Sequence, residues 1–177
     1  MATLPVIPSA NITLRDGARL TIRPIQPDDS LRLQAFHTRL SPESIYLRYL
    51  SPHPVLSAAE VERFTHVDYQ NRLAFVATRL EGQEEIIVGV ARYDRLGPSR
   101  PGAAEFAIVV EDDYQGRGVG TCLAECLTAY ARAHGLDLFV AEVEAENERM
   151  LNFIRHTGLP LTKKLENGIL EIQVKIT

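Results

Sequence analysis

Residues 103–121 read AAEFAIVVEDDYQGRGVGT, an apolar run that leads directly into a glycine-rich turn. The run Ala103 to Glu111 is apolar enough for a central β-strand, and Glu105 is its one charged interior residue. After the turn, apolar residues recur at helical spacing from Val119 to Tyr130. This stretch therefore predicts a buried strand, a tight turn and a helix in immediate succession.

The flanking sequence predicts a mixed α+β fold in three layers, with a central mixed sheet of about seven strands and helices on both faces. We expect one domain over residues 12–177, preceded by a tail over residues 1–11. Turn residues and apolar periodicity mark the elements. Strands are predicted at 12–15, 19–24, 73–80, 86–96, 103–111, 138–144, 161–165 and 169–176, and helices at 31–40, 42–50, 57–64, 119–134 and 147–157.

Composition excludes several classes of function. A net charge of -4 argues against sequence-independent binding of nucleic acid, which needs clustered cations. No apolar run approaches the ~18 residues of a membrane span, and the N-terminus does not resemble a signal peptide, so we expect a cytoplasmic protein with no membrane partner. The five histidines lack metal-ligand spacing, so no metal is expected. Cys122 and Cys126 are interpreted as packing residues of one helix.

The turn from Gln115 to Thr121 predicts a phosphate site. The first amides of a helix have no intrahelical partner, and they carry the positive end of the helix dipole. Glycines allow phosphate oxygens to approach the backbone, and Arg117 could add charge. The turn lacks the lysine of a Walker A loop, the glycine register of a dinucleotide fold, and the other elements of a protein kinase. A tight turn without any ligand is the alternative.

The pattern Gln115-x-x-Gly118-x-Gly120 resembles the Q/R-x-x-G-x-G/A signature of the GNAT acetyltransferases. Asn147 and the helix after it are similar to that family's N-x-x-A/M segment, and the resemblance covers roughly residues 12–176. The N-terminal third looks most like the acetyltransferase domain of bacterial protein lysine acetyltransferases. The resemblance implies acetyl-CoA as co-substrate, bound by Ile108, Val109, Val110, Gln115, Gly116, Arg117, Gly118, Val119, Gly120, Thr121, Asn147, Asn152 and Phe153.

Acetyl transfer to an amine needs a group that takes the proton of the ammonium form. We predict that this general base is Glu105, because a carboxylate in an apolar strand would be desolvated and more basic. The acids at 111–113 are weaker candidates, since such a run usually forms a solvated face. A backbone amide between Ile108 and Val110 should polarise the thioester carbonyl. Many family members carry a tyrosine, acting as general acid, where this chain has Ile154.

The predicted reaction is transfer of an acetyl group from acetyl-CoA to a primary amine, with a protein lysine as the leading acceptor. A small-molecule amine is the first alternative, and a non-catalytic module that senses acyl-CoA is the second. The acceptor cleft is expected from residues 28–53 and 66–72, because variable loops usually carry specificity. Tyr114 and Tyr130 are interpreted as packing residues. The sequence does not predict acyl-chain preference or oligomeric state.

Overall fold

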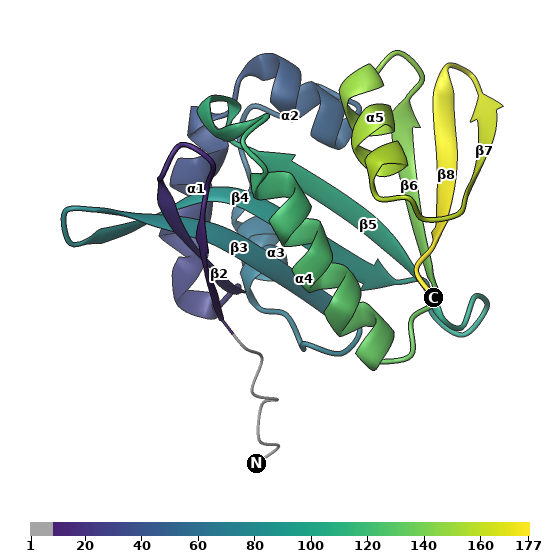
Figure 1. The fold of residues 1–177 in the computed structure, drawn as a ribbon, viewed down its shortest axis with the longest axis horizontal. Coiled ribbons are helices and arrows are strands. Elements are labelled where there is room, and N and C mark those ends of the chain that lie inside the picture. Colours follow the sequence, from purple (N-terminus) through teal and green to yellow (C-terminus); the bar gives the residue numbers. More distant parts are fainter. Residues whose placement is uncertain (1–8) are drawn as a thin grey trace.

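The computed structural model describes residues 9–177, which form one mixed sheet covered by helices on both faces (Figure 1). The strands lie in the order β1-β2-β3-β4-β5-β6-β8-β7, and within the described chain only β5 and β6 pair in parallel. The strands are β1 (Ala10–Thr13), β2 (Arg19–Pro24), β3 (Arg72–Glu81), β4 (Glu84–Arg95), β5 (Ala103–Val110), β6 (Leu138–Glu144), β7 (Leu161–Glu166) and β8 (Ile169–Lys175).

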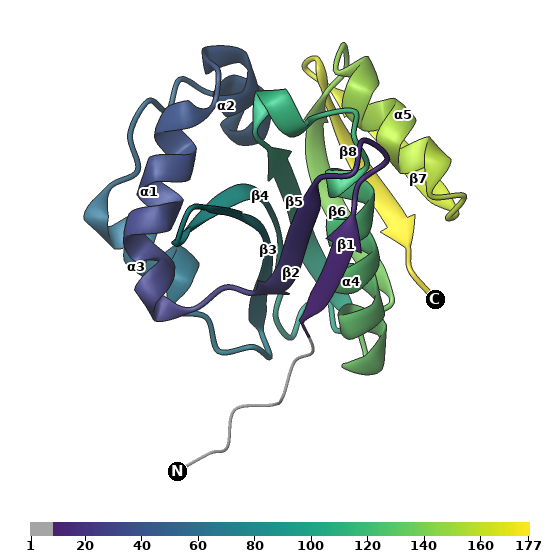
Figure 2. The ribbon, with the colours of Figure 1, turned by 60° about the vertical axis from the view of Figure 1, so that its left-hand side comes forward.

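Helices cover the two faces unequally. One face carries the long helix α4, and the other carries α1, α2 and α3, while α5 packs against the C-terminal strands (Figures 1 and 2). Short 3-10 turns at Pro27–Asp29 and Asp112–Tyr114 connect the layers. The helices are α1 (Ser30–Arg39), α2 (Pro42–Tyr49), α3 (Ala58–Thr65), α4 (Val119–Ala133) and α5 (Glu148–His156).

Local sequence explains where the helices of the second face begin. The Ser41 hydroxyl accepts the Ser44 amide at the start of α2, and Pro42 occupies the first turn. Ser57 and Glu60 form a reciprocal capping box at α3. These caps satisfy amides that would otherwise lack partners, so α2 and α3 are fixed at their N-terminal ends.

The order of elements and the layered class are as predicted, with two differences. The sheet has eight strands in the described chain, because both strands of each terminal hairpin join it. The expected tail over residues 1–11 is too long: β1 begins at Ala10, which pairs with Ile22, and residues 1–8 lie outside the described chain. The sequence did not predict the order of the strands in the sheet, in which β8 pairs with β6 and leaves β7 at the edge.

The parallel pair β5 and β6 positions the candidate site. Its two strands are in register only over Ala103–Glu105 and Leu138–Val140, and they diverge beyond Glu105. In the upper part of Figure 1 the ribbons of β5 and β6 separate, with α5 on one side and the start of α4 nearby. The second half of β5 thus has a free backbone edge, which a regular sheet would not leave inside the fold.

Candidate active site

A cavity of about 180 Å³ lies where β5 and β6 diverge. The C-terminal end of α2 contributes residues 47–50, and β5 contributes residues 105–108. Residues 141–143 of β6 line the opposite wall, together with Asn147 and Met150 at the start of α5. The cavity therefore brings together four segments that are far apart in the sequence.

The free edge of β5 directs backbone amides into this opening. The Glu111 amide donates to the Val88 carbonyl of β4 at 2.9 Å, and the register between the two strands is regular. Because amides alternate between the two edges of a strand, those of Ile108 and Val110 point away from β4, toward the gap. The Val109 amide points toward β4. Two of the three expected residues therefore direct an N–H group toward the gap, and one of them, Ile108, lines the cavity.

Glu105 lines the cavity, but its side chain is exposed. The desolvated surroundings expected from its apolar neighbours in the sequence are therefore absent, since the divergence of β5 and β6 admits solvent at this point. Asp94 is its cross-strand partner on β4, and Glu142 lines the facing wall. Two carboxylates, Glu105 and Glu142, thus line the opening and favour a cationic ligand, while Asp94 pairs with Arg63 at 3.6 Å.

The geometry of the glycine-rich turn is compatible with binding of an anion. Gly118 caps α4 with φ of 93°, a left-handed conformation that strongly favours glycine, and no heavy atom lies within 4 Å of where its Cβ would be. Within residues 9–177, the amides from Gly116 to Thr121 donate to no protein acceptor. Exposed amides at the N-terminus of a 15-residue helix favour an anion. The arrangement fits a pyrophosphate.

Gln115 fixes this turn to the rest of the site. Its amide Nε2 donates to the Val110 carbonyl at 2.8 Å and to the Ser44 hydroxyl of α2 at 3.1 Å. The Gln115 side chain thus satisfies the Val110 carbonyl at the free edge of β5 and holds the turn against α2. The structure places Gln115 as a positioning residue for the turn.

Arg117 was expected to add positive charge to the phosphate site, but in the structure it pairs with Asp16. Its guanidinium pairs with Asp16 of the β1–β2 turn at 2.6 Å, lies 4.5 Å from the Tyr114 ring centroid, and donates to the Asp113 carbonyl. The Ala18 backbone amide, which donates a hydrogen bond to the Asp16 carboxylate, and the hydrogen bond and charge of Arg117 hold the pKa of Asp16 below its usual value. Arg117 is therefore engaged by the hairpin in this structure.

The three candidates on or before α5 differ in position. Asn147 lines the cavity and caps α5, since its Oδ1 accepts the Met150 amide at 3.0 Å. Phe153 packs against the first turn of α4, 3.6 Å from where a Cβ on Gly120 would lie. Asn152 is exposed and accepts a hydrogen bond from Arg155, so the structure does not place it at the cavity.

Ile154 is buried in the small core between α5 and the C-terminal strands. Its side chain faces Val143, Leu151 and Ile172 rather than the opening. An apolar residue suits this position, because the surrounding side chains are apolar. The position at which other family members carry a tyrosine therefore contributes packing here.

Of the acids at 111–113, Asp112 and Asp113 are exposed, as the expected solvated face requires, but Glu111 and Asp112 also have specific partners. Glu111 pairs with Arg39 of α1 at 3.1 Å, and Asp112 accepts hydrogen bonds from the Ser41 amide and from both serine hydroxyls of α2, at Ser41 and Ser44. Burial alone would raise the pKa of Asp112, but these hydrogen bonds lower it below its usual value. These acids join the helical layer to the turn.

Several cavity residues were not predicted individually. Glu142, Arg48, Tyr49 and Met150 line the opening. Arg48 and Tyr49 lie within the expected acceptor segment 28–53, but nothing in their spacing indicated which end of it reaches the site. No residue of 66–72 lines the cavity: Tyr69 packs in the core.

The remaining tyrosine and cysteine side chains that could take part in chemistry pack against the main hydrophobic core. Tyr114 and Tyr130 pack against the main core, as predicted. Cys122 and Cys126 also pack there, and burial raises the pKa of both thiols. In the described part of the chain there is no cluster of three potential metal ligands. None of its helices is both long and apolar enough to cross a membrane.

A sheet that opens between two parallel strands, with the free amides of a helix N-terminus beside the opening, is compatible with a transferase that uses an acyl-CoA. The chain matches the family described as Acetyltransferase (GNAT) domain over residues 19–160, and it belongs to that family. It is thus a member of the N-acetyltransferases.

Relatives and solved structures agree with this assignment. An acetyltransferase of Pseudomonas aeruginosa is 34% identical over 138 residues, which is 78% of this chain and 73% of that protein. Acetyltransferase Pat of Mycolicibacterium smegmatis is 32% identical over 83% of this chain, which spans 43% of Pat. The crystal structure of the GNAT domain of S. lividans PAT superposes with a TM-score of 0.87 at 35% identity, covering 98% of this chain and 99% of that one.

Proposed function

We propose that this protein is an acetyl-CoA-dependent N-acetyltransferase whose acceptor is a primary amine, with a protein lysine as the leading candidate. The observation that carries the proposal is the opening between β5 and β6. It combines free β5 amides, carboxylates and a nearby anion-binding turn in one place. Each of these groups has a separate task in acetyl transfer.

The donor half of the site fits acetyl-CoA, which when bound supplies an activated acetyl group as a thioester. The amides of Val119, Gly120 and Thr121 would hold its pyrophosphate, since they have no acceptor in the described chain. The free edge of β5 can hydrogen-bond the pantetheine arm as a neighbouring strand would. Asn147, at the start of α5, lies on the other side of this path.

The acceptor half must remove a proton from an ammonium group, because a lysine amine with a pKa of about 10.4 is protonated at neutral pH. Glu105 takes that proton, and the free amine then forms a bond to the acetyl carbon. The amide of Ile108 or Val110 donates a hydrogen bond to the carbonyl oxygen as negative charge develops there. The sulfur leaves with the bonding electron pair, and solvent in the open cavity can protonate it.

Glu142 is a rival base, because it lines the same cavity from β6. The variants Glu105→Gln and Glu142→Gln form a matched pair, since each replaces one exposed carboxylate with an amide of similar size. We expect Glu105→Gln to lower kcat by about 100-fold or more while the Kd for acetyl-CoA stays within about twofold. Glu142→Gln should keep most of the activity. The reverse result would assign the base to Glu142, and full activity of both variants would exclude a carboxylate base.

Two observations bear on the acceptor. The exposed side chains of Glu105 and Glu142 leave the cavity accessible to a lysine on a protein surface, and the N-terminal third resembles bacterial protein lysine acetyltransferases. A small amine remains the alternative. Mass spectrometry of a cell lysate and of a panel of small amines, each incubated with the protein and acetyl-CoA, distinguishes the two. Binding of acetyl-CoA without transfer to any amine would instead support a non-catalytic module.

A further inference from the structure

Arg92 is a buried cation without a carboxylate partner. It lies on β4 with 9% of its surface exposed, and no carboxylate oxygen of residues 9–177 lies within 4.0 Å of its guanidinium. One nitrogen, Nη2, donates to the Phe64 carbonyl at 2.8 Å, and the group lies 4.2 Å from the Phe64 ring centroid. An unpaired buried charge is costly, so buried charges in proteins usually have a partner of opposite charge.

Burial lowers the pKa of Arg92 to about 10, with repulsion from Arg48 acting in the same direction. The guanidinium therefore stays charged at neutral pH. Its Nε and Nη1 atoms have no hydrogen bond within the described chain, and neither atom is sealed from solvent. Both remain available as donors to a ligand.

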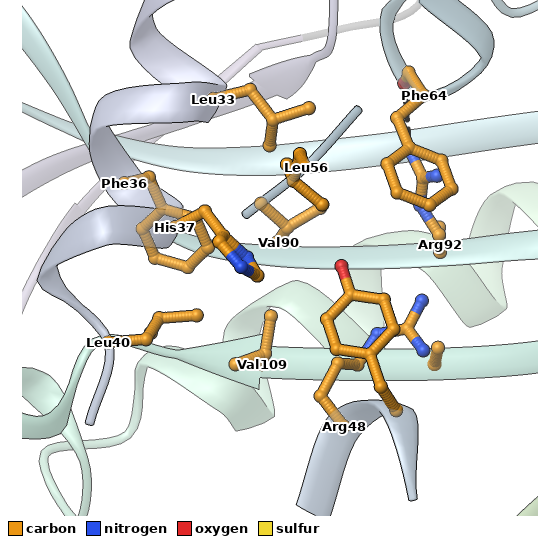
Figure 3. Close-up of a pocket in the computed structure, with 12 residues that line it drawn as sticks. Leu33, Phe36, His37, Leu40, Arg48, Leu56, Phe64, Val90, Arg92 and Val109 are labelled. Atoms are coloured by element: carbon orange, nitrogen blue, oxygen red, sulfur yellow. Dashed lines mark hydrogen bonds between the residues drawn. The ribbon is translucent and has the colours of Figure 1, made fainter. Parts of the chain in front are cut away.

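A small pocket of about 30 Å³ lies beside this guanidinium (Figure 3). Leu33 and Phe36 of α1, with Leu40 just after that helix, form the apolar side of the pocket. Arg48 of α2 and Arg92 of β4 approach from the other side. A single water needs about 10–15 Å³ by the same measure, so the pocket has room for two oxygen-sized groups. This is the size of a carboxylate.

Tyr49 adds a neutral donor to the same pocket. Its ring stacks on His53 with centroids 4.3 Å apart, which fixes its orientation. Burial raises the pKa of Tyr49, so its hydroxyl keeps its proton and can donate. Arg48 and Tyr49 line both the small pocket and the larger cavity that contains Glu105, so the two spaces adjoin.

The strand register gives the separation of Arg92 from the candidate base. Arg92 is the cross-strand partner of Ala107, and Glu105 lies two residues before Ala107 on the same face of β5. With about 3.4 Å per residue along a strand and about 5 Å between strands, the Cα atoms of Arg92 and Glu105 lie roughly 8 Å apart. One short molecule or one dipeptide unit can reach both side chains.

We propose that Arg92, with Arg48 and Tyr49, binds a carboxylate of the acceptor that lies a few bonds from the amine to be acetylated. The inference rests on the proposed function, because it assumes that the amine is placed at Glu105. The acceptor would then carry its positive charge near Glu105 and Glu142, which line the opening, and its negative charge near Arg92. The carboxylate belongs either to a free amino acid or to an acidic residue next to a lysine.

Binding to the CoA-loaded protein tests this inference without turnover. Two probe pairs differ only by carboxylate or carboxamide: L-leucine with L-leucinamide, and the blocked peptides Gly-Lys-Glu-Gly and Gly-Lys-Gln-Gly. Calorimetry should give a Kd about 10-fold to 100-fold lower for the carboxylate member of at least one pair, as expected for a charge-assisted bidentate contact. The pair that responds identifies the source of the carboxylate.

Arg92→Met should weaken binding of the carboxylate probe only, and so remove its preference over the carboxamide probe. Arg79→Met is the control, because it makes the same replacement on β3, away from the pocket, and it should leave the preference unchanged. Arg48→Met alters a less buried side chain and should reduce the preference by several-fold if Arg92→Met does not fold. Equal affinity within both pairs for the wild-type protein, or no binding of either carboxylate, would overturn the inference. Failure of the proposed function has a different signature: carboxylate binding with no acetyl transfer.

Discussion

The substitution Gly118→Ala separates the two roles of the glycine-rich turn. Gly118 has φ of 93°, and nothing lies within 4 Å of the position of an added Cβ. The cost to folding is therefore conformational rather than a clash, about 1–2 kcal/mol for an L-residue in this region. For a chain of this length that corresponds to a fall in Tm of about 2–8 °C.

Binding of acetyl-CoA should suffer more than folding. The added methyl group would project into the open space in front of the α4 amides, where we place the pyrophosphate. We expect the Kd for acetyl-CoA to rise about tenfold or more, which is about 1.4 kcal/mol of binding free energy. Isothermal calorimetry measures this Kd, and thermal unfolding followed by circular dichroism measures Tm.

Gly168→Ala is the matched control. Gly168 lies in the β7–β8 turn with φ of 81°, and it also has nothing within 4 Å of an added Cβ. Its replacement should lower Tm by a similar amount while the Kd for acetyl-CoA stays within about twofold. If Gly118→Ala binds acetyl-CoA as tightly as the control does, the turn is not the pyrophosphate site.

Three further predictions follow from the ionic contacts. Arg23 pairs with the fully buried Asp29 at 2.7 Å. Burial alone would raise the pKa of Asp29, but Arg23 and a backbone amide lower it overall, so the stabilisation is complete above about pH 4 and is lost as pH falls through the folded-state pKa. Urea unfolding from pH 7 to pH 2 should show this loss, and Asp29→Asn should flatten it. Asp112→Ala removes three hydrogen bonds from α2, so the free energy of unfolding should fall by about 1 kcal/mol or more, and an unchanged urea midpoint would contradict this. Asp16→Asn should release Arg117 toward a bound pyrophosphate and tighten acetyl-CoA binding about twofold to fivefold at low salt, measured by calorimetry; weaker binding would show that the pair instead supports the turn.

Local patterns made most of the fold predictable. The run from Ala103 to Glu111 became β5, and the glycine pattern after it became the turn into α4. The capping box at Ser57 and the asparagine-glycine turn at Asn167 mark their elements directly. Such signals depend on residues that are near one another in the chain. The position of β8 between β6 and β7 depends on long-range pairing, which neither periodicity nor turn residues specify.

The environment of the site was less predictable than its residues. Glu105 was identified as a charged residue within an apolar strand, but its exposure results from the divergence of β5 and β6, which leaves no mark in either strand's sequence. Arg92 occupies an ordinary alternating position on β4, and only the folded chain shows that it lacks a carboxylate partner. Sequence patterns therefore predicted the proposed donor half of the site in more detail than the proposed acceptor half.

Helix α2 joins these two halves. Near its N-terminal end, the Ser44 hydroxyl donates a hydrogen bond to Asp112 and accepts one from Gln115, and both of these residues lie in the segment that leads into the glycine-rich turn. Its C-terminal end places Arg48 and Tyr49 in both the small pocket and the larger cavity. Because α2 is only eight residues long, a shift at Ser44 would displace the acceptor wall as well. The contacts that hold the turn against β5 therefore also set the distance between the acceptor side chains and Glu105.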